Sequence, residues 1–167
     1  MDAKTGEKDK FAIYDCKQKK KVRNISKAVY CAEVMNGKLY FYDASGNLSA
    51  IRYYDANGVA HAYFALTNHQ GDVVSFYNNN GVHVASYEYD AWGNCTIAKD
   101  TDGIAALNPI RYRGYYYDTE TELYYLQSRY YNPKVGRFLN ADGQISNVGG
   151  DVLGYNMFAY CMNNPVN

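Results

Sequence analysis

A regular succession of turn signals most constrains the fold of this chain. Between them lie short stretches rich in Tyr, Val, Ile and Phe, such as residues 38–42 and 73–77. Asn-Gly and Asp-Gly pairs favour tight hairpin turns because both residues tolerate positive φ. Short strands at this spacing predict an antiparallel all-β meander, sandwich or barrel. The glycines, each beside an Asn or Asp and spaced 9 to 13 residues apart, are Gly37, Gly46, Gly58, Gly71, Gly81, Gly93 and Gly103.

Within this period a tighter motif recurs, in which tyrosine is followed by Asp or Asn and then, three residues later, by glycine. Copies begin at Tyr42, Tyr54, Tyr77 and Tyr89. We expect the Asp or Asn to accept hydrogen bonds from turn amides about two residues on, and the glycine to supply the positive φ. The chain holds 20 tyrosines against six Phe and one Trp. We interpret this excess as cross-strand stacking of rings whose hydroxyls stay in water.

These motifs resemble the YD repeats of the RHS (rearrangement hotspot) family. The second half resembles the family's RHS repeat-associated core domain more closely still, through residues 112–138, 141–143 and 156–166. The resemblance covers roughly residues 38–167 and includes little of the first 35. It divides the chain into a basic N-terminal segment (1–35), YD-repeat hairpins (36–108) and an RHS repeat-associated core (109–167).

The resemblance implies a non-catalytic structural fragment of a bacterial polymorphic toxin, secreted or displayed at the cell surface as part of a longer parent protein. Antiparallel YD-repeat hairpins would form a curved sheet or partial shell around a C-terminal toxin, with the core domain at the end of the shell. The implied partners are that toxin domain and the upstream YD repeats. A piece of such a shell leaves a strand edge open, which predicts self-association or coverage of the edge by the N-terminal segment.

A second interpretation is that the core is autoproteolytic. Several members of the family cut themselves with aspartates of two Asp-Pro-x-Gly-like motifs. The resemblance nominates Asp142, in an Asp142-Gly143 pair that lacks the proline, with Arg137 as its partner. The second motif would fall beyond Asn167. An aspartate needs a second carboxylate or a polarising partner to act as an acid or base at neutral pH. The alternative role for Asp142 is to cap a turn, which the missing second motif favours.

A third interpretation is a carbohydrate-binding module, because a tyrosine-rich surface can stack on sugars.

The acidic turn 118–122 lacks the glycine and the final glutamate of a calcium-binding EF-hand loop, and a solvated turn is favoured. Glu122 stands where members of the RHS family usually have glycine. We therefore expect this turn to be less tight than theirs.

No pattern in the sequence indicates a metal or a cofactor. Cys16, Cys31, Cys95 and Cys161 form no CxxC pair, so neither a zinc ribbon nor a thioredoxin-like site is indicated. The three histidines, at positions 61, 69 and 83, have no helical i, i+4 spacing. No phosphate-binding loop or nucleophile elbow is present either.

Charge and hydropathy exclude further classes. The net charge is zero, which disfavours nucleic acid as the main partner, and the apolar runs are too short for membrane insertion. No signal peptide is visible. Residues 1–27 carry nine basic residues against four acidic ones, which we interpret as a solvated terminus.

One short helix is predicted around 156–162, because Phe158 and Met162 are spaced i, i+4 before a helix-ending Asn164-Pro165.

Overall fold

The computed structural model describes residues 10–15, 20–26, 31–141 and 156–166 of the chain. This part is built mostly of antiparallel strands in open sheets, and none of the described sheets closes into a barrel. The all-β prediction is therefore confirmed. The chain divides into two compact units, Met1–Val84 and Ala85–Asn167.

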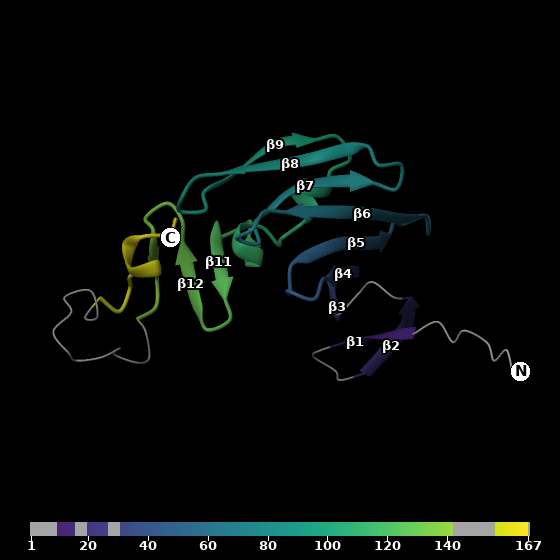
Figure 1. Ribbon diagram of the computed structural model, residues 1–167, viewed down its shortest axis with the longest axis horizontal. Coiled ribbons are helices and arrows are strands. Elements are labelled where there is room, and N and C mark those ends of the chain that lie inside the picture. Colours follow the sequence, from purple (N-terminus) through teal and green to yellow (C-terminus); the bar gives the residue numbers. More distant parts are fainter. Residues whose placement is uncertain (1–9, 16–19, 27–30, 142–155, 167) are drawn as a thin grey trace, which may run out of the picture. The chain divides into compact units, whose positions relative to one another are not determined.

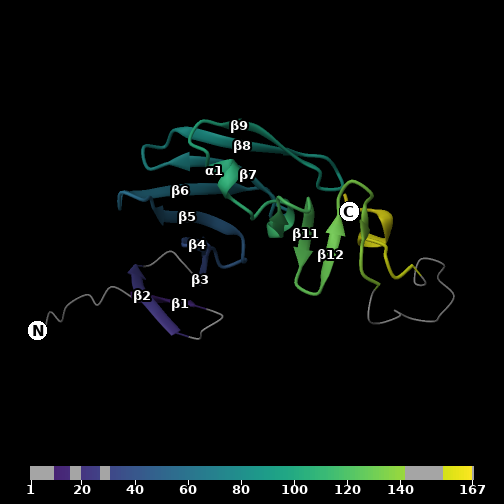
Figure 2. The same cartoon turned by 180° about the vertical axis from the view of Figure 1, so that it is seen from behind.

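The first unit is a meander of hairpins, visible from both sides in Figures 1 and 2. Neighbouring strands pair antiparallel in chain order. A separate two-stranded hairpin lies upstream, in the segment interpreted from the sequence as a solvated terminus. That hairpin comprises β1 (Lys10–Asp15) and β2 (Lys20–Ser26), and the meander comprises β3 (Cys31–Met35), β4 (Lys38–Tyr42), β5 (Leu48–Tyr54), β6 (Ala60–Thr67) and β7 (Val73–Asn78).

The turns of the meander have the predicted chemistry. In one of them Asp55 Oδ1 accepts hydrogen bonds from the amides of Asn57 and Val59, each at 2.9 Å. The Gly58 amide donates to the Asp55 carbonyl at 3.0 Å, and Gly58 has φ 78°. The same side-chain bonds recur in the turns that begin at Asp43, Asn68, Asn78 and Asp90. Asp and Asn therefore serve equally as the acceptor.

Aromatic and branched side chains in register form the interior of the first unit. Tyr40 on β4 faces Ile51 on β5, which faces Tyr63 on β6. All three are buried. Because side chains alternate between the faces of a strand, this row fixes which face of each hairpin points inward.

The second unit begins in β8 (His83–Tyr89), which pairs antiparallel with β9 (Cys95–Asp100). A short helix α1 (Ile104–Leu107) and a 3₁₀ turn η1 (Tyr112–Gly114) follow. The chain then forms a four-stranded antiparallel sheet in sequence order. Its strands are β10 (Tyr116–Asp118), β11 (Leu123–Leu126), β12 (Arg129–Asn132) and β13 (Arg137–Phe138).

One of the seven predicted hairpin turns is wrong. Gly103 has the expected positive φ of 74°, but it is the N-cap residue of α1 and does not join two strands. The carboxylate of Asp100 explains why a helix begins here. It accepts hydrogen bonds from the amides of Ala105 and Ala106, at 3.2 and 3.0 Å, which satisfies donors that a helix N-terminus leaves open. No helix in the described ranges is long and apolar enough to cross a membrane.

A short C-terminal helical element is present, but it does not cover the predicted span 156–162. The chain forms instead a single turn, η3 (Cys161–Asn163), whose three residues have left-handed φ values of 47°, 50° and 63°. Phe158 and Met162 are both exposed, so they share no buried face. Tyr160, which is only 3% exposed, is instead the side chain that packs in the interior. Its burial determines the local conformation and overrides the i, i+4 pattern.

Candidate functional site: a tyrosine clasp

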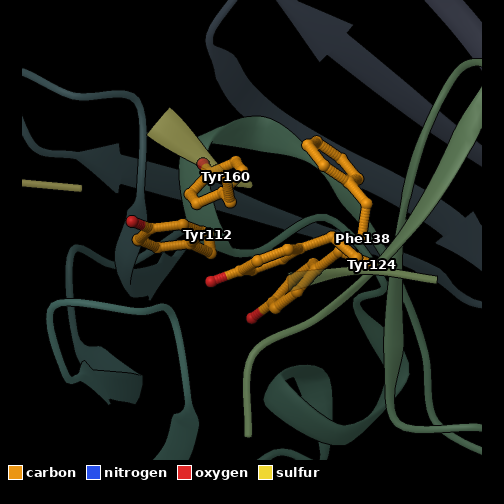
Figure 3. Close-up of a cluster of buried hydrophobic side chains, with 5 residues drawn as sticks. Tyr112, Tyr124, Phe138 and Tyr160 are labelled. Carbon is orange, nitrogen blue, oxygen red and sulfur yellow. The ribbon is translucent and has the colours of Figure 1, made fainter. Parts of the chain in front are cut away.

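Five aromatic side chains gather in the interior of the second unit (Figure 3). Each is at most 7% exposed, and the set comprises Tyr112, Tyr124, Tyr131, Phe138 and Tyr160. We call it the tyrosine cluster. The closest rings are those of Tyr131 and Tyr160, with centroids 4.1 Å apart. β11 and β12 place Tyr124 directly opposite Tyr131, and β13 places Phe138 opposite Tyr131, so strand register assembles most of the cluster.

Three hydroxyls of the cluster bind one turn. The Tyr112 hydroxyl donates to the carbonyl of Ala91 at 3.0 Å, and that of Tyr131 donates to Trp92 at 2.8 Å. The Tyr124 hydroxyl donates to Gly93 at 2.9 Å. Three consecutive carbonyls of the turn between β8 and β9 are thus held by three tyrosines from later in the chain. We call residues 90–94 the Trp92 turn and this set of bonds the tyrosine clasp.

The expectation that tyrosine hydroxyls remain in water is wrong for the clasp. Tyr124 and Tyr131 are fully buried, and their hydroxyls are satisfied by backbone carbonyls. Burial raises the pKa of both phenols well above the ordinary value, because the charged phenolate would lose its hydration. The clasp tyrosines therefore remain neutral hydrogen-bond donors.

Two glycines allow close packing around the Trp92 turn. A Cβ atom on Gly136 would lie 2.8 Å from Cε3 of Trp92, and one on Gly93 would lie 2.6 Å from Cδ1 of Tyr112. Both glycines also have left-handed φ, at 65° and 87°. The Asn94 side chain adds a hydrogen bond to the Pro133 carbonyl at 3.1 Å. The turn is fixed by packing and by hydrogen bonds together.

A buried polar network lies beside α1. Asn108 is fully buried and donates to the hydroxyl of Tyr87 at 3.2 Å, and that hydroxyl donates to the Ala105 carbonyl at 2.7 Å. The guanidinium of Arg111, only 5% exposed, lies 4.5 Å from the ring centroid of Tyr117 and 5.4 Å from that of Tyr87. Arg111 Nε donates to the Asn108 carbonyl at 3.2 Å. Ring faces and carbonyls thus stabilise this cation, which fits a structural role.

Arg113 attaches the last described segment. Its guanidinium donates to the Pro165 carbonyl and to Cys161 Sγ, and it lies 5.8 Å from the ring centroid of Tyr160. Within the described part of the chain, the buried Tyr160 hydroxyl has no hydrogen-bond partner. Tyr160 is therefore held in the cluster by its ring, whereas Tyr124 and Tyr131 are held by ring and hydroxyl.

One of the two residues nominated for self-cleavage, Arg137, lies within the described structure. Arg137 is exposed on β13. Its backbone is the strand partner of Asn132 on β12 and forms an isolated β-bridge with Ala159. Asp142 lies outside the described residues, so the nominated pair stays a prediction.

The other candidate groups are separate in the structure. His61 contacts the Asp55 carboxylate at 3.3 Å and stacks on Tyr53, and His83 packs on Tyr77. No cluster of His, Cys, Asp or Glu suited to a metal ion occurs among the residues described.

The turn between β10 and β11 contains the glutamate that replaces the family's usual glycine. Glu122 has φ 59°, the left-handed conformation that glycine adopts most readily. Its amide donates to the Asp118 carbonyl at 2.8 Å, and its carboxylate contacts the Lys134 ammonium group. The turn is hydrogen-bonded and closed in this chain, and its tightness relative to the corresponding turn of other family members stays a prediction.

Sequence reasoning missed the clasp, although one signal pointed to it. The chain's single tryptophan occupies the turn position where other copies of the motif have Ser45, Asn57 and Asn80. A large apolar residue in an otherwise small and polar turn indicates that the turn packs against something. The residues that pack against it come from 112–136 and carried no mark of that role.

The chain consists of antiparallel hairpins whose turns are capped by side chains, and a buried tyrosine cluster binds the last of these turns. This arrangement defines a YD-repeat structural domain. The chain belongs to the Teneurin YD-shell family, whose model matches residues 4–166. The match begins well before residue 38 and so includes the β1–β2 hairpin. The resemblance to YD repeats and the RHS core is thereby confirmed.

Curated relatives and solved structures agree with this family. The chain is 38% identical over 183 aligned residues to the tRNA nuclease WapA of Bacillus subtilis, covering 98% of this chain and 7% of that protein. It is 33% identical to toxin protein Tse5 of Pseudomonas aeruginosa over 66% of this chain and 8% of that one. The crystal structure of TcdB2-TccC3-Cdc42 shares the fold, with a TM-score of 0.54 at 16% identity over 93% of this chain and 10% of that one. The chain thus spans a tenth or less of each of these proteins.

Proposed function

We propose that this chain is the terminal part of a β shell in a polymorphic toxin protein, and that the shell encloses a toxin domain located C-terminal to it. In this proposal the chain performs no turnover of its own. Its partners are the enclosed toxin and the upstream YD repeats, and the parent protein is secreted or surface-displayed. We propose three parts of the chain: the N-terminal segment (1–35), the YD-repeat hairpins (36–108) and the RHS repeat-associated core (109–167).

The tyrosine clasp carries the proposal. A shell that encloses another domain needs its last repeat fixed to the element that ends the shell. The hydroxyls of Tyr112, Tyr124 and Tyr131 join the Trp92 turn, which belongs to the last YD motif, to the RHS core. These three hydroxyls hydrogen-bond to backbone carbonyls, an arrangement suited to holding a structure together. A segment similar to this chain occurs in WapA, which is named as a tRNA nuclease, and in Tse5, which is named as a toxin protein.

Protease protection of the downstream domain in the longer parent protein tests the proposal. We expect that domain to be cleaved more slowly in the parent than when it is expressed alone. Trp92→Ala should raise the cleavage rate in the parent, and Val135→Ala, at a 62% exposed position, should leave it unchanged. Tyr131→Phe is the milder variant if Trp92→Ala does not fold. Equal cleavage of the enclosed and the isolated domain would contradict the proposal.

Self-cleavage by Asp142 with Arg137 is the second candidate function. Arg137 is exposed on β13 and lies five positions before Asp142 in the sequence, which is the observation that favours this function. Intact mass of a chain with its natural downstream sequence restored is the test. A cleavage product that disappears in Asp142→Asn and Arg137→Gln, while Arg129→Gln still yields it, would support this function. Persistence of the product in Asp142→Asn would exclude it.

Carbohydrate binding is the third candidate function, and one surface favours it. Tyr116, Tyr125 and Tyr130 stand directly opposite one another on β10, β11 and β12, on the face opposite the tyrosine cluster. Flat rings in a row suit stacking on sugars. A glycan array in which binding depends on Tyr125 would support this function, and an array without binding would remove it.

A further inference from the structure

Tyr125 and Tyr130 form an unusual pair among the aromatic contacts of the molecule. They are cross-strand partners on β11 and β12, adjacent strands in Figure 1, and their ring centroids lie 5.3 Å apart. Each side chain is 43% exposed. Of the tyrosine ring pairs in the described part of the chain, this is the one in which both rings are solvent-exposed. The Tyr131–Tyr160 rings are closer, at 4.1 Å, but at 0% and 3% exposure they are closed to reagents in solution.

We propose that Tyr125 and Tyr130 are an oxidative cross-linking site, which a haem peroxidase with hydrogen peroxide converts to dityrosine. This inference goes beyond the proposed function and does not rest on it. Its basis is the combination of ring contact, exposure and a fixed strand register at one pair of phenols.

The chemistry balances with hydrogen peroxide as the oxidant. Each phenol loses one electron and one proton, which gives two phenoxyl radicals. The radicals couple through a new carbon–carbon bond between ortho positions, and the two ortho hydrogens then move to the phenolic oxygens. Two electrons and two protons leave the pair in all, and they reduce one hydrogen peroxide to two water molecules.

The surroundings of the pair favour coupling within one chain. The Tyr125 hydroxyl donates a hydrogen bond to the Gln127 carbonyl, which orients this ring in the hairpin. Leu126 faces Arg129, so only Gln127 and Ser128 separate the two strands. A ring held in contact with its partner couples at a rate independent of protein concentration, because proximity replaces a bimolecular encounter.

The cross-link would also act on the tyrosine clasp. Tyr124 and Tyr131 are cross-strand partners on the opposite face of the same two strands, and their hydroxyls bind the Trp92 turn. A covalent bond from Tyr125 to Tyr130 fixes the two strands to each other. The clasp residues are then held together in the unfolded chain as well, which stabilises the folded state.

Peptide mapping of the full chain after treatment with horseradish peroxidase and hydrogen peroxide tests the inference. Trypsin cleaves after Arg113, Arg129 and Lys134, which separates Tyr125 from Tyr130. We expect peptides 114–129 and 130–134 joined, with the mass of two hydrogens missing, together with dityrosine fluorescence. Both signals should be independent of protein concentration, and the oxidised chain should unfold at higher urea than the untreated one.

Because both peptides contain further tyrosines, variants identify the pair. Tyr125→Phe and Tyr130→Phe should each abolish the joined peptides. Tyr54→Phe, at a 49% exposed tyrosine of the first unit, is the matched control and should leave them unchanged. Joined peptides that persist in both variants, or that form only at high protein concentration between two chains, would overturn the inference.

Discussion

The hydroxyl of Tyr131 lies 2.8 Å from the carbonyl oxygen of Trp92, to which it donates a hydrogen bond across 39 residues of sequence. Local turn chemistry forms the Trp92 turn, as it forms the turns at Asp43 and Asp55. The bond to Tyr131, with its counterparts from Tyr112 and Tyr124, makes this turn a point of attachment as well as a reversal of the chain.

Substitution of Gly136 should destabilise the fold more than substitution of Gly81. Both have left-handed φ, at 65° and 72°, so alanine costs ~1–2 kcal/mol at either position. At Gly136 the added Cβ would also meet the Trp92 ring at 2.8 Å, whereas Gly81 has nothing within 4 Å. We expect Gly136→Ala to lose a further ~1–3 kcal/mol of unfolding free energy in urea titrations. Equal losses for the two variants would show that Gly136 does not pack against Trp92.

Acid should weaken the capped turns. Hydrogen bonds from the Val59 amide and His61 hold the pKa of Asp55 below its usual value, and the Asn47 amide does the same for Asp43. The unfolded chain therefore binds protons more readily than the folded one. The stability from these carboxylates is present above their unfolded pKa of about 3.8 and is lost as the pH falls through the lower folded pKa.

Asp55→Asn is the variant that checks the acid prediction. Asparagine retains the acceptor oxygen, as the Asn78 turn demonstrates, so the variant should fold normally at neutral pH. Its urea midpoint should fall less than that of the unmodified chain between about pH 5 and pH 3. An unchanged fall would mean that the Asp55 carboxylate does not contribute to acid sensitivity.

Glycine should be tolerated better at position 122 than at 120. Glu122 has φ 59°, and glycine there relieves ~1 kcal/mol of left-handed strain. The lost contact with Lys134 is solvent-exposed on both sides, so its loss offsets little of this gain. Glu120→Gly is the matched control, because it adds the same flexibility to the unfolded chain without relieving strain. Thermal unfolding should give a higher midpoint for Glu122→Gly than for Glu120→Gly, and the opposite order would contradict the argument.

Local signals in the sequence predicted the turns well and the clasp not at all. The hydrogen bonds of Asp43, Asp55 and Asn78 join residues two and four apart, so a short motif contains all their partners. The bonds of Tyr112, Tyr124 and Tyr131 cross 21 to 39 residues and end on backbone carbonyls, which have no residue signature.

The errors at Gly103 and Cys161 have a related cause. Each is a place where contacts decided against a local pattern: the Asp100 carboxylate caps α1 at the first, and the burial of Tyr160 governs the second. The resemblance to the RHS core identified the segment 112–138 as special, but it did not show which atoms these residues bind.

The paired variants Tyr131→Phe and Tyr160→Phe test the central claim most directly. Both remove a single hydroxyl from a buried ring of the tyrosine cluster. Of these two hydroxyls, that of Tyr131 binds the Trp92 turn, whereas that of Tyr160 has no partner among the described residues. We expect Tyr131→Phe to lose ~1–3 kcal/mol of unfolding free energy in urea, because the part-buried Trp92 carbonyl is left without its donor. Tyr160→Phe should retain full stability or gain slightly. Equal losses from the two variants, or no loss from Tyr131→Phe, would contradict the tyrosine clasp.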